Sequence, residues 1–214
     1  MSYIAERRQE EKERRRAEIL DAAEVIAAKD SWESLTMDQV ARQARLSRAL
    51  VYVYFKDKED LLFGLSERGI NMLRQRFEEA MARNRRGLDQ VLGMGRAYIA
   101  FSQEFPVFFE VMARCEMVNQ DTQELDPNQQ ACHEGGKAVR ALIVAALATG
   151  IGDGSVRQDV GDLNAVAIVL YGFTHGVIQV AAVKAKMLAE DSIQGRDLME
   201  QALLMCVRSI AAAS

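Results

Sequence analysis

The apolar residues of this chain recur at intervals of three and four along most of its length, which is the period of an amphipathic α-helix. One such repeat runs through residues 17–29, a short one through 37–44 and another through 48–55. The chain has only two prolines, is rich in helix-favouring residues and shows no clear strand-like alternation. The pattern therefore predicts an all-α fold.

Two of these repeats meet across a break that is too tight for an ordinary loop. Thr36 and Gln39 have the spacing of a capping box, which predicts that the first helix begins here. Arg45 interrupts its apolar face, and Ser47 is a favourable N-cap for the second helix. Helices joined by so short a turn must cross steeply. This predicts a helix-turn-helix, whose second helix can enter the major groove of DNA.

The second helix has two expected faces. The residues expected to point inward are Leu50, Val51, Tyr54 and Phe55. Those expected to point outward are Arg48, Ala49, Tyr52 and Val53. A preceding helix over residues 17–29 is expected to pack on both helices of the helix-turn-helix, with Trp32 and Leu35 closing the small core.

This region resembles the DNA-binding domain of the tetracycline-repressor (TetR-like) family of bacterial regulators. The resemblance covers about the first third of the chain and rests on a capped helix, a turn, an aromatic-rich reading helix and a basic start to the next helix. The matching residues are Thr36, Val40, Ala41, Ala44, Leu46, Ser47, Tyr52, Tyr54, Phe55, Lys58, Glu59 and Leu61. The family usually has glycine where Arg45 stands and often at Ser31, so Arg45 is expected to need a positive φ.

Candidate DNA contacts follow from the outward face and from the helix ends. Near bases we expect Arg48, which can read guanine, Ala49, which can approach a thymine methyl, and Tyr52. Candidate phosphate contacts are Thr36, Arg45, Ser47, Tyr54 and Lys58. The charged run at residues 6–18 is expected to be a solvated helical face with internal ion pairs, and the alternative is that Arg14–Arg16 reach DNA.

The remainder of the chain is expected to form a helical body. One long helix is expected from residue 58 to about 83, and a link follows it at 84–87. A further helix is expected to have Pro106 in its first turn. A polar loop at 119–129 and a helix over 131–148 come next. We therefore divide the chain into a DNA-binding domain, residues 13–60, and a ligand-binding and dimerisation domain, residues 61–214.

Residues 105–117, in the helical body, are rich in aromatic and sulfur-containing side chains. Each of these residues taken singly fits hydrophobic core, but together with polar groups they have the composition of a ligand pocket. The candidate ligand-binding residues are Phe105, Phe108, Phe109, Met112, Tyr171 and His175.

The segment 163–183 has apolar residues on both sides, so it must be covered on both sides. A final helix through residues 198–210 supplies one cover. In the resembling family the last two helices form a two-fold dimer, which implies a homodimer through the corresponding segments here. The uncharged stretch 165–183 also requires a membrane check, and its Thr174, His175 and Gln179 favour a buried helix over a span.

Charge and chemistry narrow the function. The formal net charge is −4, and residues 1–58 hold 12 Lys and Arg against 11 Asp and Glu, so any basic surface must be local. The three cysteines lack metal-ligand spacing, which suggests reduced thiols in a cytoplasmic protein, and the opening residues lack the apolar core of a secretory signal. The two histidines are far apart, and the sequence has no nucleophile motif or dinucleotide fingerprint. We therefore expect no catalytic residues, no metal and no cofactor.

These observations predict a homodimeric regulator that binds a double-stranded DNA operator. The resemblance implies a repressor that a small, largely apolar effector releases from DNA. The alternative is a DNA-binding regulator controlled by a protein partner, for which an exposed apolar patch and a filled core would be expected.

Overall fold

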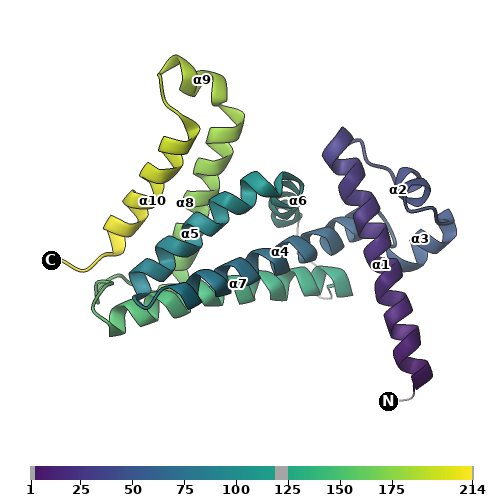
Figure 1. Ribbon diagram of the computed structural model, residues 1–214, viewed down its shortest axis with the longest axis horizontal. Helices are drawn as coiled ribbons and strands as arrows, with labels where there is room; N and C mark the ends of the chain where they lie inside the picture. The colour runs from purple at the N-terminus through teal and green to yellow at the C-terminus, as the bar shows by residue number, and fades with distance from the viewer. Residues whose placement is uncertain (1–2, 119–124, 214) are drawn as a thin grey trace. The chain divides into compact units, whose positions relative to one another are not determined.

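The computed structural model describes residues 3–118 and 125–213, in which α-helices are the regular secondary structure, as predicted. Figure 1 labels the helices along the chain. They are α1 (Tyr3–Asp30), α2 (Met37–Gln43), α3 (Arg48–Tyr54), α4 (Lys58–Arg83), α5 (Gly87–Glu104), α6 (Pro106–Met117), α7 (Pro127–Gly152), α8 (Leu163–Val183), α9 (Ala185–Glu190) and α10 (Gly195–Ile210).

The chain packs as two compact units. The first consists of residues 1–69 and 105–133, and the second of residues 70–104 and 134–214. The first unit thus contains α6 and the start of α7 in addition to the predicted DNA-binding segment 13–60. Helices α4 and α7 each contribute residues to both units.

The first unit is built on three helices that share an apolar core. Helix α2 packs on α1 and on α3, and α1 also contacts α6. Within this core Ile19, Val40, Val51 and Phe55 are fully buried. Trp32 and Leu35 are buried as predicted, so the connector between α1 and α2 is part of the core rather than a solvated loop.

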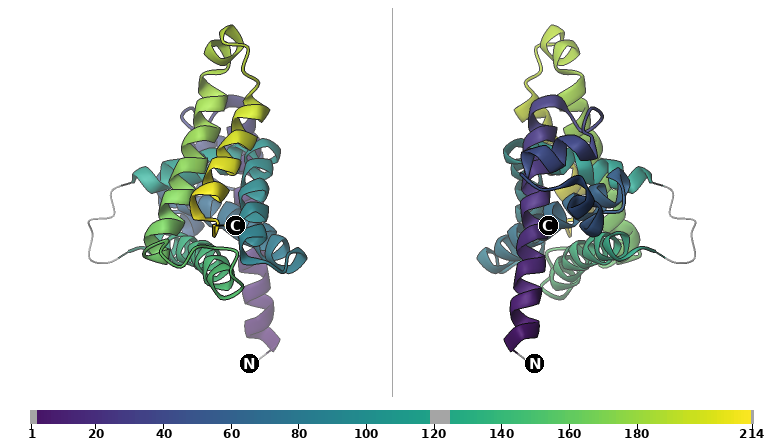
Figure 2. Two further views of the ribbon diagram at one scale, coloured as in Figure 1. Left: turned by 90° about the vertical axis from the view of Figure 1, so that its left-hand side faces the viewer. Right: turned by 90° about the vertical axis from the view of Figure 1, so that its right-hand side faces the viewer.

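The second unit is built around α5, α8 and α10, which contact one another. Figures 1 and 2 show α8 and α10 side by side, with α9 at the end where they join. The carboxylate of Asp153 accepts a hydrogen bond from the backbone N–H of Gly87 (2.8 Å), and the hydroxyl of Ser155 accepts one from that of Leu88 (3.1 Å). These bonds satisfy two N–H groups that the first turn of α5 leaves free.

Some expected helix limits agree with the structure and others differ. Helix α4 ends at Arg83 and α6 begins at Pro106, as expected. Helix α1 begins much earlier than residue 17 because the charged run 6–18 is itself helical. The last three residues of the expected polar loop 119–129 open α7, with Pro127 in its first turn, while 119–124 lie outside the described residues. Helix α7 also continues to Gly152, beyond the expected end at 148.

Helix α8 has one buried face and one exposed face. Asp162 caps it by accepting a hydrogen bond from the N–H of Ala165 (2.8 Å). Ala167, Leu170, Thr174 and Ile178 are buried within the second unit. The opposite face is apolar and exposed, and its large exposed residues are Ile168, Val169, Phe173, Val180 and Val183. The covering expected on both sides is therefore present on one side only within a single copy.

Among the described residues, α7 and α8 are long and apolar enough to cross a membrane by length and composition. This is weak evidence for a membrane span, since core helices of helical proteins meet the same criterion. The buried face of α8 against α5 and α10 agrees with the expected packed helix.

Candidate functional site

The helix-turn-helix is fixed by two N-caps. The hydroxyl of Thr36 accepts a hydrogen bond from the N–H of Gln39 (3.3 Å), and the amide oxygen of Gln39 accepts one from the N–H of Thr36 (2.8 Å). This is the predicted capping box. The hydroxyl of Ser47 accepts a hydrogen bond from the N–H of Leu50 (3.2 Å), which caps α3 as expected.

Arg45 lies in the turn between α2 and α3 with a φ of 57°. This confirms the positive φ expected where glycine is usual. Ser31 also has a positive φ, 76°, at the end of α1. A side chain in this region meets a steric cost that glycine does not, so both positions hold modest backbone strain. The side chain of Arg45 is exposed and free to reach a phosphate.

The exposed face of α3 is the one that the sequence predicts. Arg48, Ala49, Tyr52 and Val53 are all exposed, whereas Val51 and Phe55 are fully buried. The expected inward position of Phe55 is therefore confirmed, and Tyr54 is half-buried. Small, aromatic and cationic groups thus share one solvent-facing surface at the start of the helix.

Arg48 is held by neighbours on both helices. Its Nε lies 3.0 Å from Oδ1 of Asp38 in α2, and its guanidinium lies over the ring of Tyr52 at 5.4 Å from the ring centroid. The Tyr52 hydroxyl and the Asp38 carboxylate raise the pKa of Arg48. Asp38 could not be assigned to this site from the sequence, because its contact with Arg48 depends on how the two helices cross.

Lys58 is partly engaged within the first unit. Its Nζ donates to the backbone carbonyl of Glu33 (2.8 Å) and lies 5.5 Å from the ring centroid of Trp32. Burial lowers the pKa of the Lys58 ammonium. A phosphate contact from Lys58 therefore has to extend from this position or replace the bond to Glu33.

Arg14, Arg15 and Arg16 of the charged run form ion pairs within the chain. Arg14 and Arg15 pair with Glu11 and Glu18 along α1. Arg16 points into the first unit, where it bonds Glu67 (2.7 Å). The expected internal ion pairs are therefore present, and the alternative role in DNA contact has no support at Arg16.

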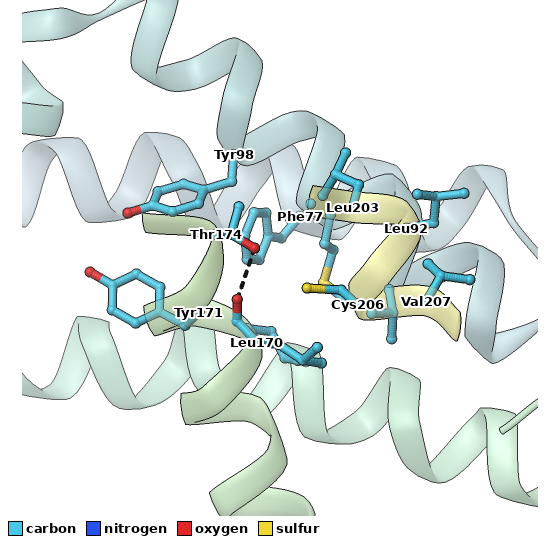
Figure 3. Close-up of a pocket in the computed structure, with 13 residues that line it drawn as sticks. Phe77, Leu92, Tyr98, Leu170, Tyr171, Thr174, Leu203, Cys206 and Val207 are labelled. Carbon is cyan, nitrogen blue, oxygen red and sulfur yellow. Dashed lines mark hydrogen bonds between the residues drawn. The ribbon is translucent and has the colours of Figure 1, made fainter. Parts of the chain in front are cut away.

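The second unit contains an apolar cavity of about 40 Å³ (Figure 3). The residues that line it come from α4, α5, α7, α8 and α10. In Figure 3, Tyr98 and Tyr171 lie on one side and Cys206 and Val207 on the other. The hydroxyl of Thr174 donates to the carbonyl of Leu170 (2.8 Å), so that polar group is satisfied internally.

An aromatic and polar cluster adjoins the cavity. The hydroxyl of Tyr98 lies 2.7 Å from Nδ1 of His175, and Nε2 of His175 lies 3.0 Å from the side-chain amide of Gln179. The ring centroids of Tyr98 and Tyr171 are 5.7 Å apart. The expected site residues Tyr171 and His175 therefore lie together. Tyr98 was not predicted as a site residue, since only tertiary packing brings it to Tyr171 and His175.

The other four candidate ligand residues lie in the first unit, three of them on α6 and Phe105 directly before it, and they are not among those that line this cavity. Phe108 and Met112 are buried and pack on Gly69 of α4, where an added Cβ would lie 3.0 Å from the Met112 sulfur. Phe105 and Phe109 are half-buried. Core packing therefore describes Phe108 and Met112, and their role in ligand binding stays a prediction.

In the described ranges, no group of three or more His, Cys, Asp and Glu side chains could hold a metal ion. What the first unit presents is a capped helix-turn-helix with an exposed second helix, and what the second presents is an apolar cavity and an uncovered helical face.

Comparisons with known proteins agree with this description. Residues 19–65 match the family model for bacterial regulatory proteins of the tetR family. Over 51 residues the chain is 41% identical to the HTH-type transcriptional regulator HbdR of Aromatoleum sp. (strain CIB), a match that covers 24% of this chain and 22% of that protein. The matches span less than a third of the length of the curated relatives.

Solved structures extend the likeness to nearly the whole fold. A bacterial regulatory protein of the tetR family from Rhodococcus RHA1 has a TM-score of 0.69 at 15% identity, over 94% of this chain and 98% of that one. The fatty acid degradation regulator FadR from Bacillus halodurans has a TM-score of 0.70 at 16% identity, over 90% and 94%.

The fold and the exposed second helix define a helix-turn-helix protein with a helical body. The chain is TetR-like: residues 19–65 match the model of the tetR family of bacterial regulatory proteins, and a solved regulator of that family shares the fold. The relatives that carry a functional name are regulators, in agreement with the expectation that the chain is not an enzyme.

Proposed function

We propose that the protein is a sequence-specific DNA-binding transcriptional regulator, a homodimeric repressor that a small, largely apolar effector releases from its operator. The observation that carries the proposal is the capped and exposed α3, which presents Arg48, Ala49 and Tyr52 to solvent within the segment matched by the family model. A helix held in this way can enter the major groove with its first residues at base edges.

The reading residues divide by chemistry. Arg48 can donate two hydrogen bonds to guanine, and Ala49 is small enough to approach a thymine methyl. Thr36, Ser47 and Arg45 lie exposed at helix ends or in the turn, where contacts to phosphates fix the position of the protein on DNA.

The uncovered face of α8 supports a homodimer. Ile168 is 53% exposed and Val169 is 67% exposed, and no neighbouring atom lies within 4 Å of an added Cβ at Gly172 or Gly176. On α10, Met205 is also exposed. An apolar stripe with small residues allows a second copy of the same helix to approach closely and removes the stripe from water.

Two copies related by a two-fold axis present two α3 helices. Such a pair fits two half-sites on one side of DNA when they lie about 34 Å apart or at a compatible spacing. The operator is therefore expected to be an inverted repeat, because its symmetry mirrors that of the dimer.

The cavity in the second unit is our candidate for the effector site. It is lined mainly by apolar side chains, and the Tyr98, Tyr171 and His175 cluster offers hydroxyl and imidazole groups beside it. A volume of about 40 Å³ is far below the roughly 300–1,000 Å³ of ordinary ligand sites. Effector binding therefore requires that helices α5, α8 and α10 separate, which links occupancy to a change in helix packing.

This linkage provides the mechanism of release. An effector that binds better to an opened second unit lowers the affinity for DNA by the same coupling free energy, typically about 1–3 kcal/mol. Helix α4 is the candidate lever, because it follows the reading helix α3 directly in the chain and its second half contributes Phe77 to the cavity lining. The fatty acid degradation regulator with the same fold supports a largely apolar effector.

Control by a protein partner is the second candidate. The observation in its favour is the exposed apolar face of α8, which a partner could cover as well as a second copy could. The cavity, with its aromatic and polar border, favours the effector model. In either case the proposed location is the cytoplasm, where the DNA lies.

The test is to recover the sites that the purified full-length protein selects from a pool of random duplexes. An inverted repeat with two half-sites is the expected result. Recovery of unrelated sequences at every round would contradict sequence-specific binding, and recovery of single half-sites would contradict the dimer.

A further inference from the structure

Two cysteines of the first unit are in close contact inside its core. Cys115 on α6 and Cys132 on α7 are buried, with 3% and 7% of their surface exposed. Their sulfur atoms lie 2.9 Å apart, and both are free thiols in this structure. A disulfide bond is about 2.05 Å long, so closing the gap requires a movement of only about 0.9 Å.

The two thiols have different surroundings. The two sulfurs share a hydrogen bond in which either thiol can be the donor. This bond and the nearby hydroxyl of Ser66 lower the pKa of Cys115. The same bond, with burial, raises the pKa of Cys132. Cys115 is therefore the thiol that loses its proton and acts as the nucleophilic thiolate. Cys132 keeps its proton until its sulfur attacks the oxidised sulfur of Cys115.

We propose that Cys115 and Cys132 form a peroxide-oxidation site, at which hydrogen peroxide converts the buried dithiol into a reversible disulfide. The short distance between the sulfurs and their shared burial carry the inference. Burial restricts the oxidant to a small molecule, which is why a peroxide fits and a bulky disulfide reagent does not. The inference goes beyond the proposed function and needs no DNA for its test.

The reaction balances in two steps. The Cys115 thiolate attacks one peroxide oxygen, the O–O bond breaks, and the leaving hydroxide takes up the thiol proton as water, which leaves a sulfenic acid on Cys115. The Cys132 sulfur then attacks the Cys115 sulfur, the S–O bond breaks, and hydroxide leaves with the Cys132 proton as a second water. Two electrons pass from the sulfurs to the peroxide.

The disulfide would join α6, which contacts α1, to the first part of α7. One turn before Cys132, the side-chain amide of Asn128 donates to Asp60 (2.8 Å) and accepts from Arg16 (2.9 Å), in α4 and α1 respectively. Oxidation therefore ties α6 to the same segment of α7 that these bonds hold against the first unit. In a reducing compartment such a bond is transient, which suits a sensor rather than a structural link.

Mass spectrometry of the full-length protein tests the site directly. Trypsin leaves both cysteines on one peptide, residues 115–137, because no Lys or Arg lies between Arg114 and Lys137. The reduced protein is denatured, labelled with a maleimide and digested, and this peptide should carry two labels. After treatment with hydrogen peroxide it should carry none and lack two hydrogen atoms, and dithiothreitol should restore both labels.

Cys206 is the internal control, since its tryptic peptide should keep its label throughout. In Cys132→Ser, peroxide should leave a sulfenic acid on Cys115 that dimedone traps; in Cys115→Ser, Cys132 should keep its thiol. A peptide 115–137 that retains both labels at peroxide concentrations at which Cys206 already loses its label would overturn the proposal. So would a disulfide that involves Cys206, or direct conversion of Cys115 to a sulfinic acid.

Discussion

Arg48 on α3 and Asp38 on α2 form an ion pair across the helix-turn-helix, with 3.0 Å between Nε and Oδ1. Both side chains are largely exposed, so the pair contributes little to the free energy of folding. Its effect is on orientation, because it holds the guanidinium on the outward face of α3, above the ring of Tyr52.

Replacing Arg48 with Ala should weaken binding to the operator by about 1–3 kcal/mol, because the hydrogen bonds to the base that Arg48 reads are lost. Fluorescence anisotropy with a set of single-base operator variants measures this. The variant should no longer distinguish bases at one position in each half-site. An equal loss for every duplex would assign Arg48 to phosphate contact instead.

Replacing Asp38 with Asn should free the Arg48 side chain. Discrimination at the Arg48 position should fall, and affinity for unrelated duplexes should rise slightly because a negative charge near the phosphates is removed. The double variant Asp38→Asn, Arg48→Ala is the control. If Asp38 acts through Arg48, adding Asp38→Asn to Arg48→Ala should not alter base discrimination further.

Thr36 should contribute to stability through its cap. Thr36→Ala removes the oxygen that accepts from the N–H of Gln39 and should cost about 1 kcal/mol of unfolding free energy. For a chain of this length the melting temperature should fall by roughly 2–4 °C. Thr36→Ser keeps the oxygen and is the matched control. Equal melting temperatures for the two variants would show that the cap does not stabilise the helix.

Arg45 should serve DNA binding at some cost in backbone strain. Arg45→Gly relieves the positive φ but adds freedom to the unfolded chain, so unfolding free energy should change by less than about 1 kcal/mol. Affinity should fall alike for all duplexes, and the slope of log affinity against log salt should flatten by about one. An unchanged salt slope would argue against a phosphate contact.

The exposed face of α8 should be the dimer interface. Ile168→Glu places a charge on that face without disturbing the core of one copy, so the protein should stay folded and become monomeric. Val25→Glu on α1 is the matched control, since Val25 and Ile168 are both 53% exposed. Light scattering after gel filtration gives the mass of each. Operator affinity of Ile168→Glu should fall by about 100-fold or more, since two linked half-sites are lost.

Features set by neighbouring residues were predictable from the sequence. Thr36 and Ser47 cap helices through bonds to residues three positions later, and such local spacing can be read directly. The strain at Arg45 was expected because the resembling family usually has glycine at this position. The division of α3 into buried and exposed faces follows from helical period alone.

Features that depend on packing between distant segments were not predictable. Arg16 looks like part of a solvated charge run, yet it bonds Glu67 and Asn128, far along the chain. Phe108 and Met112 have a composition that fits a pocket or a core equally, and the structure packs them on Gly69. Tyr98 joins His175 because α5 lies against α8, which no local pattern shows.

The most direct test of the account is binding of the purified protein to the DNA immediately upstream of its own gene, measured by gel shift over a salt series beside an unrelated duplex. The account predicts a discrete complex on the upstream DNA that persists at salt concentrations where the unrelated duplex is released. Equal, salt-sensitive binding to both duplexes would contradict sequence-specific recognition of this DNA by the exposed face of α3.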